Sequence, residues 1–326
     1  MMLTRELPVG IPDLPARSTA SGCSLCGDPT PEVWLTGPDR FNGRQKQYEL
    51  VRCPKCSLVW LKNPPSPSEM GDHYGPDYDR TIADAAKAST HWLPCRDELL
   101  RLKSGGSLLD LGCGSGGFLG AIKSPSWKLY GVEMSENAAK LARQRCGAEV
   151  YIGDVLDAPF PPNSFDAITC FNVFEHMYEP REVLCKVAEW LKPGGVFYTM
   201  MPNIDSAGAR IFRSYWYALE LPRHLFHFSP ATLKMLARSV GLRETLVIAK
   251  RELYVERSMH YVVDELLRKI GISRPPMARA KASSLPWKVV IKAFRLTFLP
   301  LITASAYLVG DGETITAIFT KDGVSA

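Results

Sequence analysis

Residues 107–118 read Ser-Leu-Leu-Asp-Leu-Gly-Cys-Gly-Ser-Gly-Gly-Phe, an apolar run followed by four glycines within six positions. Such a run predicts a buried strand, a tight turn and the start of a helix, the arrangement with which an α/β sheet holds a nucleotide-like cofactor. Glycine has no Cβ, so the main chain at Gly112, Gly114 and Gly116 can approach a ligand closely. The segment therefore predicts a doubly wound α/β fold with a cofactor site at this turn.

The charge beside the turn bears on the identity of the cofactor. Gly112, Gly114 and Gly117, with Glu133 further on, also satisfy the dinucleotide fingerprint. A pyrophosphate is anionic and binds helix N-terminal amides, whereas Asp110 places a carboxylate next to the loop. This carboxylate favours a cationic ligand, and S-adenosylmethionine carries an ammonium group that Asp110 could bind.

Polar residues end the next two predicted strands. Residues 128–134 form a strand pattern with Glu133 near its end, and the Glu133 carboxylate could accept both ribose hydroxyls of the cofactor. Residues 148–154 end in Gly153-Asp154, where Asp154 could accept a hydrogen bond from the adenine amino group. Further strands are predicted at 165–173, 196–201, 242–249 and 313–321, and a helix at 231–240.

In this order of motifs the chain resembles the class I S-adenosylmethionine-dependent methyltransferases. The motifs are Asp110-x-Gly112-x-Gly114-x-Gly116, Glu133, Gly153-Asp154, Phe165-Asp166, Glu175-His176 and Leu191-Lys-Pro-Gly-Gly195. The resemblance covers 105–250 and 311–322, and implies a Rossmann-like sheet whose last strand is antiparallel. It implies that the cofactor is bound by Asp110, Gly112, Cys113, Gly114, Gly116, Phe118, Glu133, Met134, Asp154, Val155, Phe171 and Asn172.

Four of the nine cysteines form two Cys-x-x-Cys knuckles, Cys23/Cys26 and Cys53/Cys56. Two such knuckles offer four thiolates to one tetrahedral zinc, and a site with no open position is structural. The alternative is a redox pair, but no βαβ pattern surrounds either knuckle. A small zinc ribbon is therefore predicted over 21–62, with paired strands at 47–51 and 58–60.

Composition and the N-terminal region set the expected compartment. The chain has 326 residues, 46% of them hydrophobic, and a formal net charge of +5, which allows two domains and does not by itself require nucleic acid. Residues 1–20 contain no apolar stretch long enough for a signal peptide. We expect 1–20 to be a disordered tail and the protein to be cytoplasmic.

The remaining regions flank the predicted methyltransferase domain, 105–250. Residues 63–104 are predicted to be a proline-rich linker and a helical cap, with a helix from Trp92 to Leu102 and with Tyr74 and Tyr78 either near the ligand or packed between domains. Residues 251–310 are predicted to be a helical insertion before the last strand, which lies in 311–326.

The insertion at 251–310 holds ten Lys or Arg against four Asp or Glu. Lys288, Lys292 and Arg295 would share one helical face, a pattern compatible with peripheral contact to the inner membrane face. The alternative is a helical subdomain on the sheet with a solvated basic edge. The apolar run at 296–309 is too short to span a bilayer.

Candidates for a catalytic base follow the fourth and fifth strands, where the crevice of a doubly wound sheet lies. They are His176, preceded by Glu175, and His224 and His227, any of which could accept a proton from a hydroxyl nucleophile. The run from Arg223 to Leu233 resembles a subgroup that includes ubiquinone-type O-methyltransferases and enzymes of polysaccharide biosynthesis, many with an N-terminal four-cysteine zinc ribbon.

The predicted function is methyl transfer from S-adenosylmethionine, foremost to an oxygen of a small-molecule, sugar or glycan acceptor. Alternatives are C-methylation of a nucleotide sugar, a non-catalytic binding protein, and RNA methylation with the ribbon as nucleic-acid module. Basic and aromatic residues interleave at 40–62, but acidic residues dilute them and no Asn-Pro-Pro-Tyr-type motif follows the fourth strand. Nucleic acid is therefore the less favoured partner.

Overall fold

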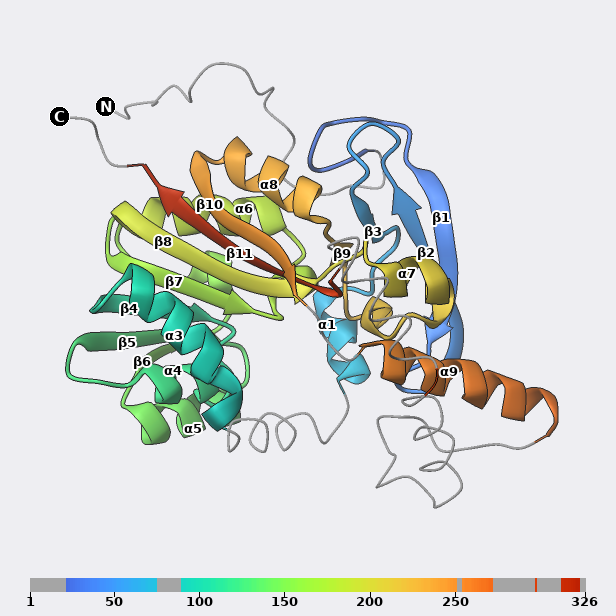
Figure 1. Cartoon of the computed structure of the whole chain (residues 1–326), viewed down its shortest axis with the longest axis horizontal. Helices are drawn as coiled ribbons and strands as arrows, with labels where there is room; N and C mark the ends of the chain where they lie inside the picture. The colour runs from blue at the N-terminus through green and yellow to red at the C-terminus, as the bar shows by residue number, and fades with distance from the viewer. Residues whose placement is uncertain (1–21, 75–88, 251–253, 272–296, 298–311, 323–326) are drawn as a thin grey trace.

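A seven-stranded sheet forms one half of the molecule (Figure 1). The computed structural model describes residues 22–74, 89–250, 254–271, 297 and 312–322. The strands, in spatial order, are β10 (Leu242–Lys250), β11 (Thr314–Lys321), β8 (Leu191–Pro202), β7 (Phe165–Phe171), β4 (Gly106–Leu111), β5 (Trp127–Glu133) and β6 (Glu149–Ile152).

The pairing directions confirm the predicted fold class. The neighbours β6, β5, β4, β7 and β8 are parallel, whereas β11 lies antiparallel between β8 and β10. The strand order reverses between β4 and β7, and a ligand crevice forms outside the carboxyl ends of the strands at such a point. Asp110 and the glycine turn lie there, at the end of β4.

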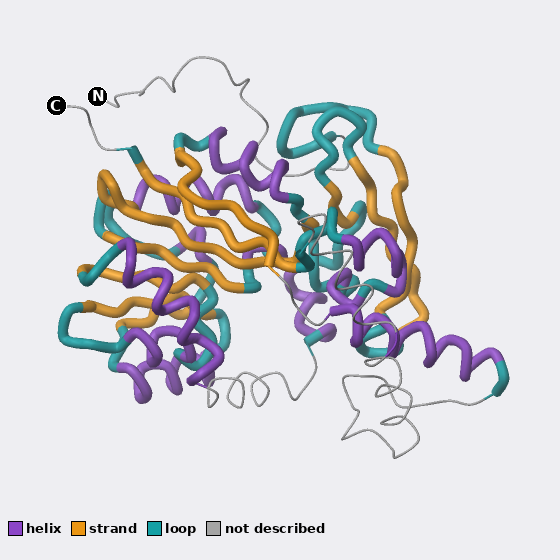
Figure 2. The backbone as a smooth tube through the Cα atoms, viewed as in Figure 1, coloured by secondary structure: helices purple, strands orange, loops and turns teal. Residues whose placement is uncertain are grey.

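Helices cover both faces of this sheet, as Figure 2 shows. Successive strand side chains point to opposite faces, so Leu108 and Leu109 belong to separate hydrophobic cores. The core around Leu108 includes residues of α3 (Leu93–Leu102), α4 (Gly117–Ile122) and α5 (Glu136–Cys146). The core around Leu109 includes residues of α6 (Pro180–Trp190) and α8 (Pro230–Ser239).

Most predicted boundaries lie within two residues of the observed ones. The main exception is the fifth strand, which was expected to start at Val196 but begins at Leu191 as β8. Leu191 pairs with Phe165, and a register shift before Ala167 accommodates the Gly194-Gly195 pair. The Lys-Pro-Gly-Gly segment therefore belongs to the strand and not to the end of the preceding helix.

The N-terminal part forms a second sheet, of four strands. Its order is β1 (Glu32–Asp39), β2 (Arg44–Arg52), β3 (Val59–Leu61) and β9 (Phe226–His227). We call residues 22–61 the ribbon. The last strand, β9, comes from the connection after β8, and its His227 pairs with Val59 of the ribbon. The ribbon is thus hydrogen-bonded to a segment that carries a candidate catalytic histidine.

Short helices lie in the connections between the strands. They are α1 (Pro67–Met70), η1 (Gly71–His73), η2 (Ser89–Trp92), η3 (Val155–Asp157), η4 (Phe174–His176), α7 (Ala207–Phe212), η5 (Arg213–Tyr215) and η6 (Tyr217–Leu219). The expected helix between Trp92 and Leu102 is present as α3, preceded by η2. Ser66 N–H donates to Glu69 Oε2 at 2.8 Å, so a capping box starts α1 directly after the proline-rich linker.

One helix of the predicted insertion is described, α9 (Tyr254–Lys269), which extends away from the large sheet beside η6 (Figure 1). The expected tail at 1–20, Tyr78, and the basic face formed by Lys288, Lys292 and Arg295 lie outside the described residues. Within the described part of the chain, no helix has the length and apolar content needed to cross a membrane.

Candidate functional site

Asp110, near the carboxyl end of β4, is a buried carboxyl group beside the glycine turn. Thr169 Oγ1 donates a hydrogen bond to Asp110 Oδ1 at 2.7 Å. Burial, together with the nearby Glu133 carboxylate, raises the pKa of Asp110 to about 7, although the hydrogen bond from Thr169 acts to lower it. A buried carboxyl group with such a pKa gains a stabilising partner when a cationic group binds, which fits the ammonium group of S-adenosylmethionine.

Gly112 makes the turn after β4 possible. Its φ of 67° lies in the region that glycine adopts without strain. A Cβ at this position would lie 2.5 Å from Val173 Cγ2, closer than carbon atoms can approach. Gly112 is therefore required both by its conformation and by the close packing of Val173.

Glu133, the last residue of β5, is held in place by main-chain amides. Its Oε2 accepts a hydrogen bond from Gly114 N–H, and its Oε1 accepts one from Ser135 N–H, both at 2.8 Å. A carboxylate offers about four lone pairs, so both oxygens keep acceptor capacity for ligand hydroxyls. The contact with Gly114 also ties the end of β5 to the glycine turn of β4.

The other predicted cofactor residues lie at the ends of neighbouring strands. Asp154 is exposed, and its Oδ1 accepts a hydrogen bond from Leu156 N–H at 2.8 Å. Met134 is 73% exposed, so it is free to cover a ligand ring. Val155 is half-buried beside Asp154, and Asn172 is exposed at the end of β7.

The predicted aromatic residues are packed under the turn. Phe118 and Phe171 are buried with ring centres 4.9 Å apart. Trp92, for which the sequence indicated no role, packs on both rings at 5.9 and 5.5 Å. Cys113 is also buried, and its thiol lies 3.7 Å from the carbonyl oxygen of Gly114. These residues belong to the hydrophobic core next to the glycine turn. Their contact with the cofactor stays a prediction.

The structure brings the three candidate histidines together. His176 ends η4, and His224 and His227 come from the connection after β8. The ring centres of His176 and His224 are 4.5 Å apart, and those of His224 and His227 are 6.2 Å apart. His176 is half-buried, whereas His224 and His227 are only 5% and 3% exposed. His176 is therefore the most accessible of the three.

Hydrogen bonds assign the tautomers of two of these rings. His176 Nδ1 lies 3.0 Å from the carbonyl oxygen of Arg223, and His224 Nδ1 lies 2.8 Å from that of Ala218. A carbonyl oxygen only accepts, so each Nδ1 carries the proton and each neutral ring keeps its lone pair on Nε2. Burial lowers the pKa of His176 and of His227 to about 3, and that of His224 well below its usual value. All three rings are neutral near pH 7.

Glu175 is the buried acid of this cluster, at 2% exposure. Neither of its carboxyl oxygens has a hydrogen-bond partner among the described residues. Burial raises the pKa of Glu175 to about 8, so the group is protonated at neutral pH. An unpartnered buried carboxyl group is costly and is typical of a ligand site. One donor atom each from Glu175, His176 and His224 lie within 4.8 Å of one another, a set that could also ligate a divalent cation.

Tyr74, which was predicted either to lie near the ligand or to pack between domains, contributes its side chain to this cluster. Tyr74 Oη lies 3.1 Å from His176 Nδ1. Residues just before Tyr74 are fixed to the β1–β2 hairpin, because the buried His73 Nδ1 lies 3.0 Å from Asp39 Oδ2 and Asn42 Nδ2 donates to His73 O at 2.9 Å. The hairpin therefore holds Tyr74 against the candidate base.

Arg223 closes the same region from the other side. Its Nη2 donates to Glu220 Oε2 at 2.6 Å, so the guanidinium group forms an ion pair within the same segment. Its guanidinium carbon lies 3.9 Å from the ring centre of Phe41 in the ribbon and 5.7 Å from that of Tyr74. These cation–π contacts join the ribbon to the histidine segment.

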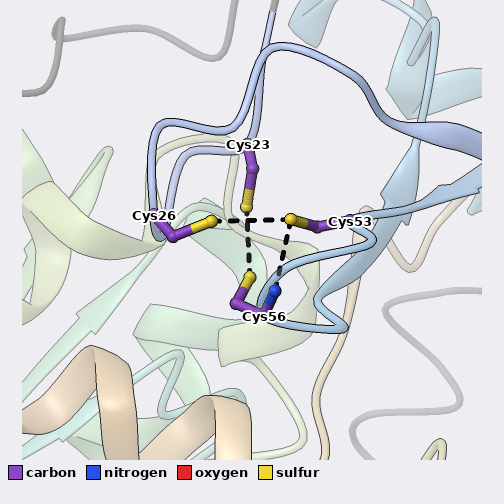
Figure 3. A group of neighbouring side chains, drawn as sticks. All are labelled: Cys23, Cys26, Cys53 and Cys56. Carbon is purple, nitrogen blue, oxygen red and sulfur yellow. Dashed lines mark hydrogen bonds between the residues drawn. The ribbon is translucent and has the colours of Figure 1, made fainter.

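The four ribbon cysteines converge on one point (Figure 3). The Cys23–Cys56 and Cys26–Cys53 sulfur pairs are 3.4 and 3.5 Å apart. Tetrahedral zinc with Zn–S bonds of about 2.3 Å sets its sulfurs about 3.8 Å apart. Four free thiols in this arrangement fit a structural zinc, which would tie the loop before β1 to the turn between β2 and β3.

Comparisons with known proteins show which family this chain is similar to. The profile of a family described as "Methyltransferase domain" matches residues 86–246. The ubiquinone biosynthesis O-methyltransferase of Thiobacillus denitrificans is 30% identical over 46% of this chain and 68% of its own length. A protein of the transposon TN4556 in Streptomyces fradiae is 33% identical over 53% of each chain, so this chain spans about half the length of that relative.

Among solved structures, the complex between the Haloferax volcanii Trm112 methyltransferase activator and a methyltransferase gives a TM-score of 0.49 at 19% identity. It covers 75% of this chain and 97% of that one.

Proposed function

Because the chain belongs to the S-adenosylmethionine-dependent methyltransferases, we propose that it transfers the methyl group of S-adenosylmethionine to a hydroxyl oxygen of a small-molecule acceptor. The observation that carries this proposal is the row of neutral imidazoles beside the switch point of the sheet. The sulfonium is a good leaving group, so the enzyme has to align oxygen, methyl and sulfur, exclude water and accept one proton.

The cofactor would be held at the ends of β4 and β5. Asp110 would bind the ammonium group, and this positive charge would bring the raised pKa of Asp110 back down. Glu133 would accept the ribose hydroxyls with the lone pairs that Gly114 and Ser135 leave unused. Asp154 and Met134 would then lie at the adenine.

His176 is the proposed base. Its Nδ1–H donates to the carbonyl of Arg223, which leaves the lone pair of Nε2 to accept the hydroxyl proton. A ring with a pKa of about 3 accepts this proton only as the O–methyl bond forms, because that step makes the hydroxyl strongly acidic. His224 is less suited, since it is buried and its Nε2 lies 3.6 Å from Glu220 Oε2.

The acceptor is proposed to be a phenol of the quinone-precursor type. The relative from Thiobacillus denitrificans, named for ubiquinone biosynthesis, supports this class. A sugar or glycan hydroxyl is the second acceptor class that the same base could serve. C-methylation of a nucleotide sugar would require a base that removes a proton from carbon, for which a histidine of such low pKa is poorly suited.

The direct test is calorimetry with S-adenosylmethionine and with NAD, followed by methyl transfer from radiolabelled cofactor to a catechol, a nucleotide sugar and RNA. We expect binding of S-adenosylmethionine alone and transfer to the catechol. His176→Gln should abolish transfer without weakening cofactor binding, while His260→Gln on α9 serves as the matched control. Binding of NAD alone would refute the proposal, and transfer only to RNA would refute the acceptor class.

Two further assignments are part of this proposal. A structural zinc in the ribbon is supported by the sulfur distances and is tested by metal analysis of the purified protein. Peripheral membrane contact through 251–310 is proposed because basic residues exceed acidic ones in this segment and three of them are predicted to share one helical face. Sedimentation with anionic liposomes, with Lys288, Lys292 and Arg295 changed together to Glu, tests that contact.

A further inference from the structure

A cavity of about 820 Å³ lies at the junction of the ribbon with α7 and α8. Trp34 and Arg52 line it from the ribbon, and Arg210 and Arg213 line it from α7 and η5. In Figure 1 this junction is where α7 lies beside the ribbon strands. Neither the glycine turn nor any of the three candidate histidines lines the cavity, so it is distinct from the proposed methyl-transfer site.

The lining carries an excess of positive charge. It includes three arginines against one acid, Asp205. Among the described residues, the guanidinium groups of Arg52 and Arg213 have no ion pair or hydrogen bond, and Arg210 donates to the main-chain carbonyl of Asp205. Three arginines around one cavity favour the binding of an anion, to which guanidinium groups donate charge-assisted hydrogen bonds.

The backbone at Arg213 adopts a strained conformation. Its φ of 48° and ψ of −118° belong to a region that glycine adopts and that Cβ-bearing residues avoid. Strained residues of this kind persist where the surrounding structure or a ligand needs them. The first residues of α8, Pro230 and Ala231, also line the cavity, and a helix N-terminus carries a partial positive charge.

The cavity is larger than a simple inorganic anion requires. Its volume falls in the range of about 300 to 1,000 Å³ that is usual for pockets of complete small molecules. The half-buried indole of Trp34 provides an aromatic wall on which a planar ring can stack. Arginine forks bind phosphate oxygens in a bidentate manner.

We propose that this cavity is a binding site for a nucleoside diphosphate or an ester of one, with the phosphates on Arg52, Arg210 and Arg213 and the base against Trp34. The site does not depend on the proposed methyl transfer, because it shares no residue with the cofactor turn or the histidine cluster. Its binding can therefore be measured whether or not the acceptor proposed above is correct.

The test is calorimetric titration of the full chain at low salt with uridine diphosphate, inorganic pyrophosphate and uridine. We expect the diphosphate nucleotide to bind more tightly than pyrophosphate, and uridine to show no binding. The Arg52→Ala/Arg213→Ala variant should lose at least tenfold in affinity for both phosphate ligands. Trp34→Leu should weaken binding of the nucleotide but not of pyrophosphate.

Controls separate loss of the site from loss of the fold. Arg238→Ala removes an arginine from the opposite end of α8 and should leave all affinities unchanged. Each variant should still bind S-adenosylmethionine with wild-type affinity, which shows that it is folded. If the double variant fails this check, the single variant Arg213→Ala replaces it in the titrations. No binding of either phosphate ligand, or binding unaffected by the arginine changes, would overturn the site. Equal binding of nucleotide and pyrophosphate would overturn the nucleoside part.

Discussion

Replacing Glu175 by Gln should remove a large pH dependence of folding stability. In the folded chain the carboxyl group is buried, has no hydrogen-bond partner among the described residues, and has its pKa raised by burial to about 8. In the unfolded chain the pKa is near 4.5. The folded state therefore holds the proton more tightly, so stability is greatest below pH 4.5 and falls as the pH rises towards 8.

The magnitude follows from this pKa difference. One pKa unit corresponds to about 1.4 kcal/mol, so the interval from 4.5 to about 8 is worth about 5 kcal/mol in full. Between pH 5 and pH 9 the wild type should lose about 4 kcal/mol through Glu175 alone. Glutamine does not titrate, so the variant should lack this loss while keeping a side chain of nearly the same shape.

Urea unfolding at pH 5, 7 and 9 gives the free energy of unfolding of both proteins. The change of this free energy with pH in the variant is then subtracted from the change in the wild type. Other groups, such as Asp110 and the three histidines, titrate in both proteins and cancel. Glu149→Gln, an exposed position at the start of β6, is the matched control and should follow the wild type. If wild type and Glu175→Gln show the same pH dependence, then Glu175 is ionised in the folded protein and a partner in the cluster stabilises its charge.

Three other changes test the cofactor turn, the contact of Tyr74 with His176 and the zinc. Gly112→Ala should lower thermal stability and weaken S-adenosylmethionine binding by at least tenfold in calorimetry, because its Cβ would lie 2.5 Å from Val173; wild-type affinity would contradict the turn geometry. Tyr74→Phe should leave the fold and cofactor affinity intact but lower kcat about tenfold and shift its pH profile, since the hydroxyl contacts His176; an unchanged profile would count against a positioning role. Cys53→Ser should abolish zinc in metal analysis and lower the melting temperature, and full zinc content would show that the four thiols are not its ligands.

Local signals in the sequence were sufficient for the large sheet and the cofactor turn. Each strand pattern is read from neighbouring residues, and Asp110, Gly112 and Glu133 follow one another at fixed offsets. The parallel order then follows from short crossover connections, for which few topologies are allowed. The missed start of β8 at Leu191 has a physical cause, since Pro193 and two glycines indicate a turn and only the pairing with Phe165 makes the segment a strand.

The histidine cluster could be predicted only as a set of candidates. The sequence placed His176, His224 and His227 after two strands that end at one edge, which is why they meet. It did not distinguish among them, because the tautomers depend on carbonyl groups of the folded chain and the pKa values depend on burial.

What the sequence by itself determined is therefore the architecture of the cofactor half, the four-cysteine cluster and the group of titratable residues at the crevice. Tertiary structure alone decided how the two halves combine. The pairing of Val59 with His227, the contact of Tyr74 with His176 and the arginine-lined cavity join residues more than a hundred positions apart. A strand pattern carries no information about a distant partner's register, so such contacts arise only from the packing of the whole chain.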